Sequence, residues 1–419
     1  MSARARWGIG SALVVLAGLA LTLAVVLSAG PQAPVTGYTG TAAARPDTAW
    51  NDLFQGYGNL SGAWSGGDGA QALPMPDGST IWFFADTFLG ATDPGGTRPP
   101  LSTGPAHNSA VLYRGGHLGP TWAQPPGAGG YSSAGDYTWV APPPPYPASR
   151  YELINGDQVL DGGVIYKFYQ LADRELHPRD FPYKLVGTVL ESFSVDSATD
   201  TPVPAGGAPI GVDDAADGNP VIWGAAVLVS RGYVYIYGVK PYNGSAEPFP
   251  LYLARVPVGG LAAGTPWQYY AADPGCSPPA SAWTSDPRSA RALRTAVSAG
   301  FSVTDVNGTF VLLTSDTSTT RTTNDAVAYY AGCPTGFAPD NPRYRVYRPN
   351  LPHGYLTYEY RIVPQFSRGS HVLVCYSTNT IRPADNFSRA AIYRPRFLDV
   401  TLPGIPGPAG PVTEPGPGP

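Results

Sequence analysis

The segment Gly78-Ser-Thr-Ile-Trp-Phe-Phe-Ala-Asp86 begins at a glycine and continues as a run of β-branched and aromatic residues. This composition predicts a strand that follows a tight hairpin turn. Four later segments repeat the arrangement, at residues 162–170, 232–240, 308–316 and 369–377. The recurrence indicates that one hairpin unit is used several times along the chain.

The spacing of these units predicts the fold class. Successive turn glycines lie 61 to 84 residues apart, an interval that is too long for one hairpin and fits a four-stranded sheet with its loops. Such a sheet is the blade of a β-propeller. The continuously apolar second strands are typical of strands covered on both faces by neighbouring blades. We therefore predict an all-β, five-bladed β-propeller over residues 47–402, with a β-sandwich of irregular hairpins as the alternative.

Helical patterns are rare in the sequence. The one helical candidate begins at Asp286-Pro287, which is a good cap followed by a good first residue, and continues to Arg294. We expect it to be short and to decorate a loop.

The two ends of the chain differ from the rest. Arg4 and Arg6 precede an apolar run from Gly8 to Gly30, the pattern of a signal peptide and also long enough for a membrane anchor. Residues 1–30 are thus expected to be a signal peptide or signal anchor, and residues 31–46 a linker. The domain would be secreted or anchored to the outer face of the cytoplasmic membrane, touching the membrane only through an uncleaved N-terminal segment. The Pro/Gly-rich tail at residues 403–419 is expected to be disordered.

Composition excludes several classes of partner. Charged residues make up only 13% of the chain and the net charge is −4, so no basic stripe is available to neutralise nucleic-acid phosphates. The five histidines are scattered without the spacing of metal ligands, so no catalytic metal and no cofactor are expected. A calcium ion on the propeller axis stays open, and the protein is expected to be a monomer.

The three cysteines lack the C-x-x-C spacing of zinc sites. An exported chain permits disulfides. Cys276 and Cys333 both lie in Gly/Pro-rich loop sequence and are the predicted pair. Cys375 lies in an apolar run and is expected to be a buried strand thiol.

An acidic pair flanks the first hairpin. If the turn is centred on Asp77, then Asp68 and Asp86 are equidistant from it, nine residues away on each side. They would face each other across the hairpin, where opposed Cβ atoms lie about 4.5–5.5 Å apart. Two carboxyls in one site can divide the work of glycosidic cleavage, one as proton donor and the other as base or nucleophile. A turn shifted by one residue would separate them, leaving a strand-end residue and a turn residue.

Four further residues are candidates for substrate binding. Asp157, in Asn-Gly-Asp, matches the position of Asp68 in the second unit. His107 and Asn108 stand at a strand entrance, where they could bind sugar hydroxyls; alternatively, His107 caps a loop. Trp223 lies at the start of an inner strand, where an indole can stack on a sugar ring, although most such tryptophans are core residues.

Several motifs resemble those of a known group of proteins. Trp64-Ser-Gly-Gly-Asp68-Gly, Trp82-Phe-Phe-Ala-Asp86-Thr-Phe-Leu-Gly90 and His107-Asn-Ser resemble actinobacterial extracellular five-bladed propeller domains of largely unknown function. That group is related to mycobacterial endo-D-arabinanases and to propeller glycoside hydrolases. The resemblance implies a five-bladed propeller that hydrolyses furanose-containing glycans of the arabinan or arabinogalactan type, with Asp68 and Asp86 as the matching acids.

One departure from the resemblance concerns the last blade. Where a His-Pro-Glu-like segment is expected, the chain has Ile362-Val-Pro364-Gln365, so an acid is expected to be missing there. A non-catalytic carbohydrate-binding or adhesion propeller at the cell surface is therefore the alternative function. A purely structural envelope protein is a third reading, favoured if apolar side chains fill the axial pocket.

Overall fold

A computed structural model describes residues 37–406, except for residues 62, 99–104, 124–138, 177–182, 197–200, 212–218, 242–247 and 318–324. The predictions for the N-terminal apolar segment and for most of the tail fall outside the described residues. Within the described part of the chain, no helix is long and apolar enough to cross a membrane.

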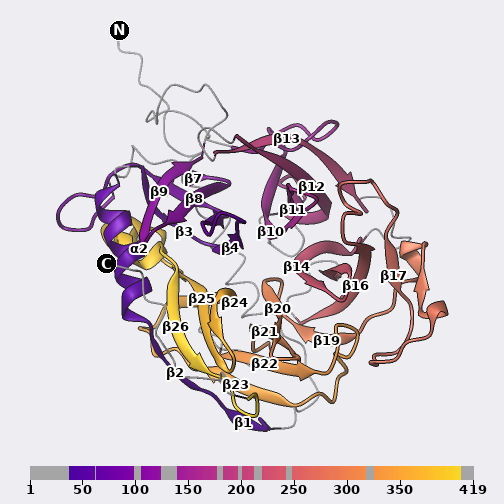
Figure 1. The fold of residues 1–419 in the computed structure, drawn as a ribbon. Helices are drawn as coiled ribbons and strands as arrows, with labels where there is room; N and C mark the ends of the chain where they lie inside the picture. Colours follow the sequence, from indigo (N-terminus) through magenta and orange to yellow (C-terminus); the bar gives the residue numbers. More distant parts are fainter. Residues whose placement is uncertain are drawn as a thin grey trace.

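Five of the six sheets stand around a central axis as the blades of a five-bladed β-propeller, as predicted (Figure 1). Blade 1 contains β4 (Gln71–Pro74), β5 (Thr80–Phe84), β8 (Ser109–Arg114) and β9 (His117–Trp122). Blade 2 contains β10 (Tyr151–Asp161), β11 (Val164–Asp173), β12 (Lys184–Asp196) and β13 (Thr201–Ile210). Blade 3 contains β14 (Ile222–Ser230), β15 (Tyr233–Val239), β16 (Phe249–Pro257), β17 (Gln268–Tyr270), β18 (Trp283–Thr284) and β19 (Arg294–Val297).

The last two blades each take one strand from the start of the domain. Blade 4 contains β20 (Phe301–Val306), β21 (Thr309–Ser315), β22 (Ala326–Ala331), β23 (Arg343–Tyr347) and, in parallel with β23, β1 (Gly40–Thr41). Blade 5 contains β24 (Tyr355–Arg368), β25 (His371–Thr380), β26 (Arg396–Thr401) and, antiparallel to β26, β2 (Ala43–Pro46). The linker expected over residues 31–46 therefore contains two strands that close the ring.

The five repeated segments form the second strand of every blade. They correspond to β5, β11, β15, β21 and β25, each paired with the strand before it. The turn glycines hold left-handed backbone, with φ of 84° at Gly78 and 80° at Gly232, a conformation that other residues adopt at a cost. The first strand of each blade, β4, β10, β14, β20 or β24, lies nearest the axis (Figure 1).

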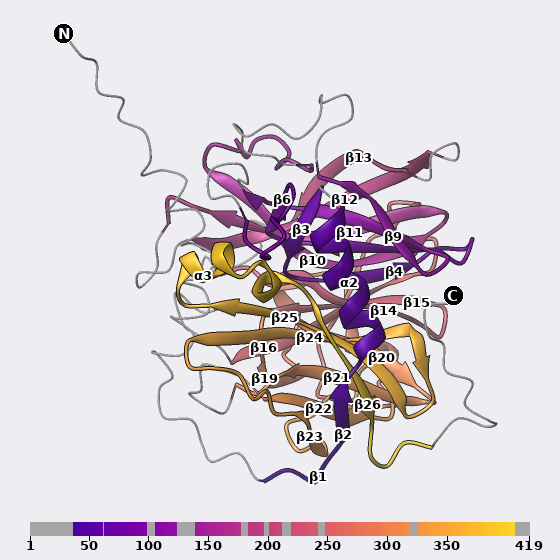
Figure 2. The same cartoon turned by 90° about the vertical axis from the view of Figure 1, so that its left-hand side faces the viewer.

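One helix was not predicted. Helix α2 (Thr48–Leu60) is capped by Asp47, whose side chain accepts a hydrogen bond from Trp50 N. Its buried Trp50 and Phe54 pack on Trp82 of blade 1 and Phe397 of blade 5. Figure 2 shows α2 on the outside of the ring beside β9 and β26. The expected helix after Asp286 is only a 3-10 turn, Pro287–Ser289.

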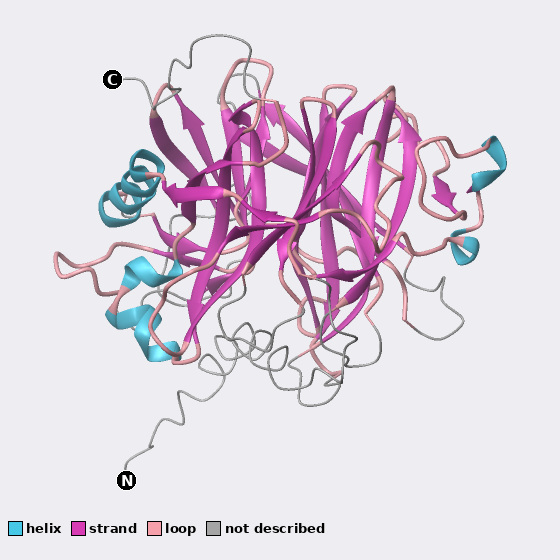
Figure 3. Ribbon diagram, turned by 90° about the horizontal axis from the view of Figure 1, so that it is seen from below, coloured by secondary structure: helices cyan, strands magenta, loops and turns pink. Residues whose placement is uncertain are grey.

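The remaining helical pieces lie at the periphery of a body built almost entirely of strands (Figure 3). They include α3 (Pro383–Ser388) and the 3-10 turns Ala280–Ala282 and Ala390–Tyr393. Apolar side chains of adjacent blades pack together to form the core.

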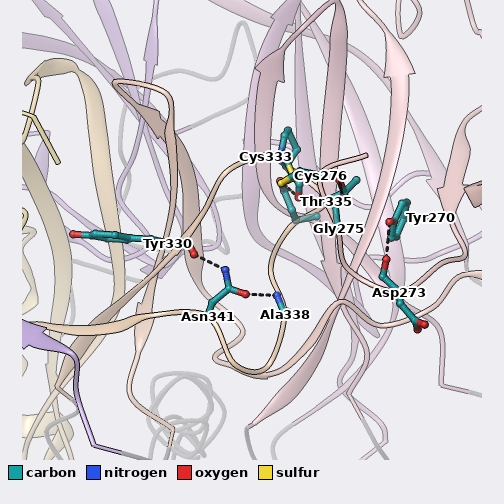
Figure 4. Close-up of a disulfide and its surroundings, with 11 residues drawn as sticks. Tyr270, Asp273, Gly275, Cys276, Tyr330, Cys333, Thr335, Ala338 and Asn341 are labelled. Atoms are coloured by element: carbon teal, nitrogen blue, oxygen red, sulfur yellow. Dashed lines mark hydrogen bonds between the residues drawn. A yellow bond between two sulfur atoms is a disulfide. The ribbon is translucent and has the colours of Figure 1, made fainter. Parts of the chain in front are cut away.

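A disulfide links two blades. Cys276, which follows β17 of blade 3, is joined to Cys333, which follows β22 of blade 4, as predicted (Figure 4). Their Cα atoms are 5.4 Å apart. Cys375 is a buried free thiol in β25, also as expected.

Candidate active site

Asp68 and Asp86 lie opposite each other near the axis. Gly67 pairs with Thr87 and Gln71 pairs with Phe83, so the register is the same on both sides of the interruption. That interruption holds Asp68, between β3 (Trp64–Gly67) and β4, and Asp86, between β5 and β6 (Thr87–Leu89). Asp68 N donates to Asp86 O at 3.2 Å. The turn is therefore centred on Asp77, which is the register the sequence required for the two acids to face each other.

The Asp68 carboxyl lies in an environment that opposes its ionisation. Burial raises its pKa well above the usual range, and the nearby charges of Asp86 and Glu359 raise it further. Tyr358 Oη donates a hydrogen bond of 2.7 Å to Asp68 Oδ2, which acts in the opposite direction. Burial prevails, so Asp68 is set up to hold a proton.

Asp86 has a different environment, because it is accessible and has a cationic partner. Its side chain is 33% exposed, and its Oδ1 lies 3.5 Å from Nδ1 of His107. Burial of His107 disfavours its charged form, but the hydrogen bond and charge of Asp86, with the charge of Glu152, outweigh burial and raise the His107 pKa. The two aspartates thus have different neighbours: Asp68 is buried and accepts a hydrogen bond from Tyr358, whereas Asp86 lies beside His107.

The fifth blade supplies an acid after all. Glu359 lies in β24, where the ladder to β25 slips between Tyr358 and Arg361. Its charge raises the pKa of Asp68, and Ser377 Oγ donates to its Oε2 at 3.4 Å. The segment Ile362-Val-Pro364-Gln365 carries no acid, as expected, but Glu359 provides a carboxyl earlier in the same strand.

One sequence signal could have located Glu359. It precedes the turn glycine Gly369 by ten residues, as Asp68 precedes Gly78. The phenols of Tyr358 and Tyr393, which both lie beside Asp68, were missed as well. Neither tyrosine stands at a repeated position in the hairpin units.

Asp157 is held by residues of blades 3 and 5. Its Oδ2 accepts from Val227 N of blade 3 at 2.8 Å and lies 3.7 Å from Arg361 Nη1 of blade 5, while Oδ1 accepts from Gln158 N. The carboxylate therefore ties three blades together. Substrate binding by Asp157 stays a prediction.

His107 lies beside Asp86, whereas Asn108 bonds to Val140. Asn108 is 1% exposed, and its amide donates to Val140 O at 3.0 Å and accepts from Val140 N at 2.8 Å. These bonds hold the backbone of Val140, and sugar binding by Asn108 stays a prediction.

Trp223 is a core residue. It is 2% exposed and packs against Trp267 and Tyr269, and its backbone is held by Thr188. A ring covered in this way offers no face to a sugar, so the stacking prediction was wrong.

No metal site is evident in the described ranges, where no group of three or more His, Cys, Asp or Glu side chains could hold a metal ion. The structure thus adds no support for an axial calcium ion.

Comparison with known proteins gives a family and a fold. The profile described as Domain of unknown function (DUF5005) matches residues 51–402. No curated protein matches the sequence. A candidate hydrolase from Bacteroides ovatus ATCC 8483 superposes with a TM-score of 0.64 at 18% identity, covering 88% of this chain and 96% of that one. This likeness supports the fold alone.

Two more distant structures are glycosidases. An α-L-arabinanase mutant from Cellvibrio cellulosa has a TM-score of 0.40 and 11% identity, covering 80% of this chain and 91% of its own. An α-L-arabinofuranosidase from Lactobacillus brevis has a TM-score of 0.42 and 9% identity, covering 80% of this chain and 90% of its own. Similarity at this level carries no argument about chemistry, which must come from the site itself.

Proposed function

The chain belongs to the DUF5005 family, and we propose that it is a glycoside hydrolase that acts on furanose-containing glycans of the arabinan or arabinogalactan type. The observation that carries the proposal is the pairing of two carboxyls with opposite environments. Asp68 has a pKa raised by burial and by neighbouring acids, and Asp86 lies opposite it beside His107. Glycosidic cleavage needs one protonated and one ionised carboxyl at the same bond.

In the proposed reaction, Asp68 donates its proton to the leaving glycosidic oxygen. Asp86 acts at the anomeric carbon from the other side, either as nucleophile or as the base that activates water. The anomeric configuration of the first product distinguishes these routes, because direct attack leads to retention and attack by water leads to inversion.

The class of glycan rests on the resemblance of the first-blade motifs to domains related to endo-D-arabinanases. We further propose that the protein works outside the cytoplasmic membrane. The apolar N-terminal segment and the Cys276–Cys333 disulfide support this location, because disulfides persist in oxidising compartments.

The test is hydrolysis of arabinan and arabinogalactan by the purified domain and by its Asp68→Asn and Asp86→Asn variants. Removing a general acid or base is expected to lower kcat by about 10²–10⁴-fold. Asp77→Asn is the matched control, because Asp77 lies at the far end of the same hairpin and holds the turn through Ser79. That variant should keep wild-type activity.

Binding is measured alongside turnover. A wild-type domain that binds these glycans without cleaving them would replace the hydrolase by the alternative, a carbohydrate-binding or adhesion propeller. Equal activity of Asp68→Asn and wild type would remove Asp68 from the mechanism.

A further inference from the structure

We infer that this propeller supplies its own axial cations: the guanidinium of Arg361 and the ammonium of Lys167 bind the oxygen atoms that an axial metal ion would need. The sequence leaves a calcium ion on the axis open. The chain's own side chains fill that position, whatever the protein hydrolyses.

The side chain of Arg361 reaches across the axis. Arg361 lies in β24 of blade 5, and its Nη2 donates to Ala225 O of β14 at 3.1 Å. Its Nη1 lies 3.7 Å from Asp157 Oδ2 of β10. The first strands follow one another around the axis in chain order, so blades 2 and 3 are the two that are not adjacent to blade 5 (Figure 1). A side chain that joins blade 5 to both of them passes through the centre of the ring.

The groups that meet there belong to irregular points of the first strands. The register of these strands shifts within residues 155–158 of blade 2, 223–226 of blade 3 and 358–361 of blade 5. A bulge leaves backbone groups without a partner in the ladder. Two such groups are Ala225 O, which accepts from Arg361, and Gly156 O, which accepts from Lys167. The bulges thus provide acceptors for the two cations.

Lys167 is the second cation, and its side chain is fully buried. Its Nζ donates to Gly156 O, to Gln158 Oε1 at 2.9 Å and to Gln71 Oε1 at 2.5 Å. An ammonium group has three N–H donors, so each donor has an acceptor here. Because Gln71 belongs to β4 of blade 1, Lys167 of blade 2 also joins the first two blades.

A metal ion does not fit among these groups. Calcium prefers carboxylate, carbonyl and amide oxygens, and the oxygens of this kind at the axis already have partners. The Asp157 carboxylate accepts from Val227 N and faces Arg361. The Ala225 carbonyl and the Gln71 amide accept from the two cations. A bound metal ion would be repelled by both cations and would take acceptors from their donors.

The first test is thermal unfolding of wild type and of Arg361→Ala, with and without methylguanidinium. Removing the cation leaves the largely buried Asp157 carboxylate without its charge partner, so the Tm should fall by on the order of 10 °C. Methylguanidinium should restore part of this loss in a saturable manner. Methylurea has nearly the same shape without the charge and should restore nothing.

Arg291→Ala is the matched control for the loss of an arginine. The ion pair of Arg291 with Asp273 is exposed, so its removal should change the Tm by no more than about 2 °C. Methylguanidinium should leave the Tm of this variant unchanged.

A double variant guards against a single variant that does not fold. Asp157→Asn combined with Arg361→Met removes both charges, and losing both partners of a buried pair costs less than losing one. Asparagine also keeps an oxygen for Val227 N. The double variant should therefore unfold at a higher temperature than Arg361→Met alone. A double variant that loses the sum of the two single losses would overturn the inference.

Calcium provides an independent arm on the wild type. The Tm should be the same after EDTA treatment and in millimolar calcium. A saturable rise in Tm with calcium that Asp157→Asn abolishes would show that a metal ion takes the axial position, against our inference. Equal rescue of Arg361→Ala by methylurea and methylguanidinium would also contradict it. Because these readouts come from unfolding alone, inactivity on every glycan would defeat the proposed function and leave this result standing.

Discussion

At the scale of single residues, burial of the Asp68 and Glu359 carboxyls works against the stability of the fold that holds them. Asp68, Asp86 and Glu359 come from blades 1 and 5 and meet where burial penalises charge. The side chain of Asp86 is 33% exposed and lies beside His107. Packing alone does not explain this arrangement, because neutral side chains of similar size would give a more stable fold.

Replacing Asp68 by asparagine should therefore stabilise the protein, and the gain should depend on pH. A carboxyl whose folded-state pKa is raised supports the fold in its protonated form, fully below the unfolded pKa of about 3.9, and this support is lost as pH rises through the folded pKa. Asp68→Asn and wild type should thus have equal Tm in acid, with the variant increasingly higher toward alkaline pH. Calorimetric scans across pH provide the check, and a wild type that is the more stable protein at alkaline pH would contradict it.

Substitution of Trp223, in contrast, is expected to destabilise the protein. Because its ring is buried between blades 2 and 3, Trp223→Ala should cost about 3–5 kcal/mol in free energy of unfolding. Trp223→Phe should cost less, and KM for the glycan should be unchanged in both. Urea unfolding measures the first effect. Full stability with weakened glycan binding would instead support the stacking role that the sequence suggested.

One of the two registers open to the first hairpin predicted that Asp68 faces Asp86, because a turn centred on Asp77 sets every pair along it. The distance from the turn glycine Gly369 could have located Glu359, but not its contact with Asp68. That contact depends on a positive φ and a slip in the ladder of β24, and on space left by Gly69 and Gly300 of two other blades.

At the scale of elements, those that form from a local pattern could be predicted from the sequence, and those that depend on distant partners could not. The five hairpins were predictable because each carries its own turn glycine and apolar return strand. Helix α2 was not, since its buried face consists of little more than Trp50, Phe54 and Gly58 and its capping by Asp47 gives a weak signal. Strands β1 and β2 are short and mostly exposed, so their partners, rather than their composition, make them strands.

The disulfide between blades 3 and 4 is the covalent element whose contribution can be measured. It spans 57 residues of sequence, and closing a loop of this size contributes about 2–4 kcal/mol by restricting the unfolded chain. The double variant Cys276→Ser with Cys333→Ser should lose that amount in denaturant unfolding. A reductant should weaken the wild type and leave the double variant unaffected; equal sensitivity of both proteins would mean that the bond contributes nothing.

At the scale of the whole molecule, ring closure is the feature that holds the site together, because Asp68 of blade 1 meets Tyr358 and Glu359 of blade 5 across the junction of first and last blades. Strand β2 completes blade 5, and Tyr38, just before β1, donates to Asp316 and lies over Arg343 and Arg345 of blade 4. The start of the domain thus fastens its two last blades.

Removing residues 37–46 should therefore lower stability and activity together. We expect a broader, earlier thermal transition, since blades 4 and 5 would each lose their outer strand. Arg45→Ala is the control within the same segment, because its ion pair with Asp399 is largely exposed and should contribute at most about 1 kcal/mol. A shortened protein that unfolds like wild type would show that the ring closes without these strands.

The contribution of β1 and β2 to the last two blades imposes an order on folding. Their partners β23 and β26 lie about 300 residues or more further along the sequence, so these early strands cannot pair until those segments have been made. Before β26 has been made, blades 1 to 3 can assemble but blade 5 stays open. The contacts of Asp68 with Tyr358 and Glu359 therefore form only after most blades are in place.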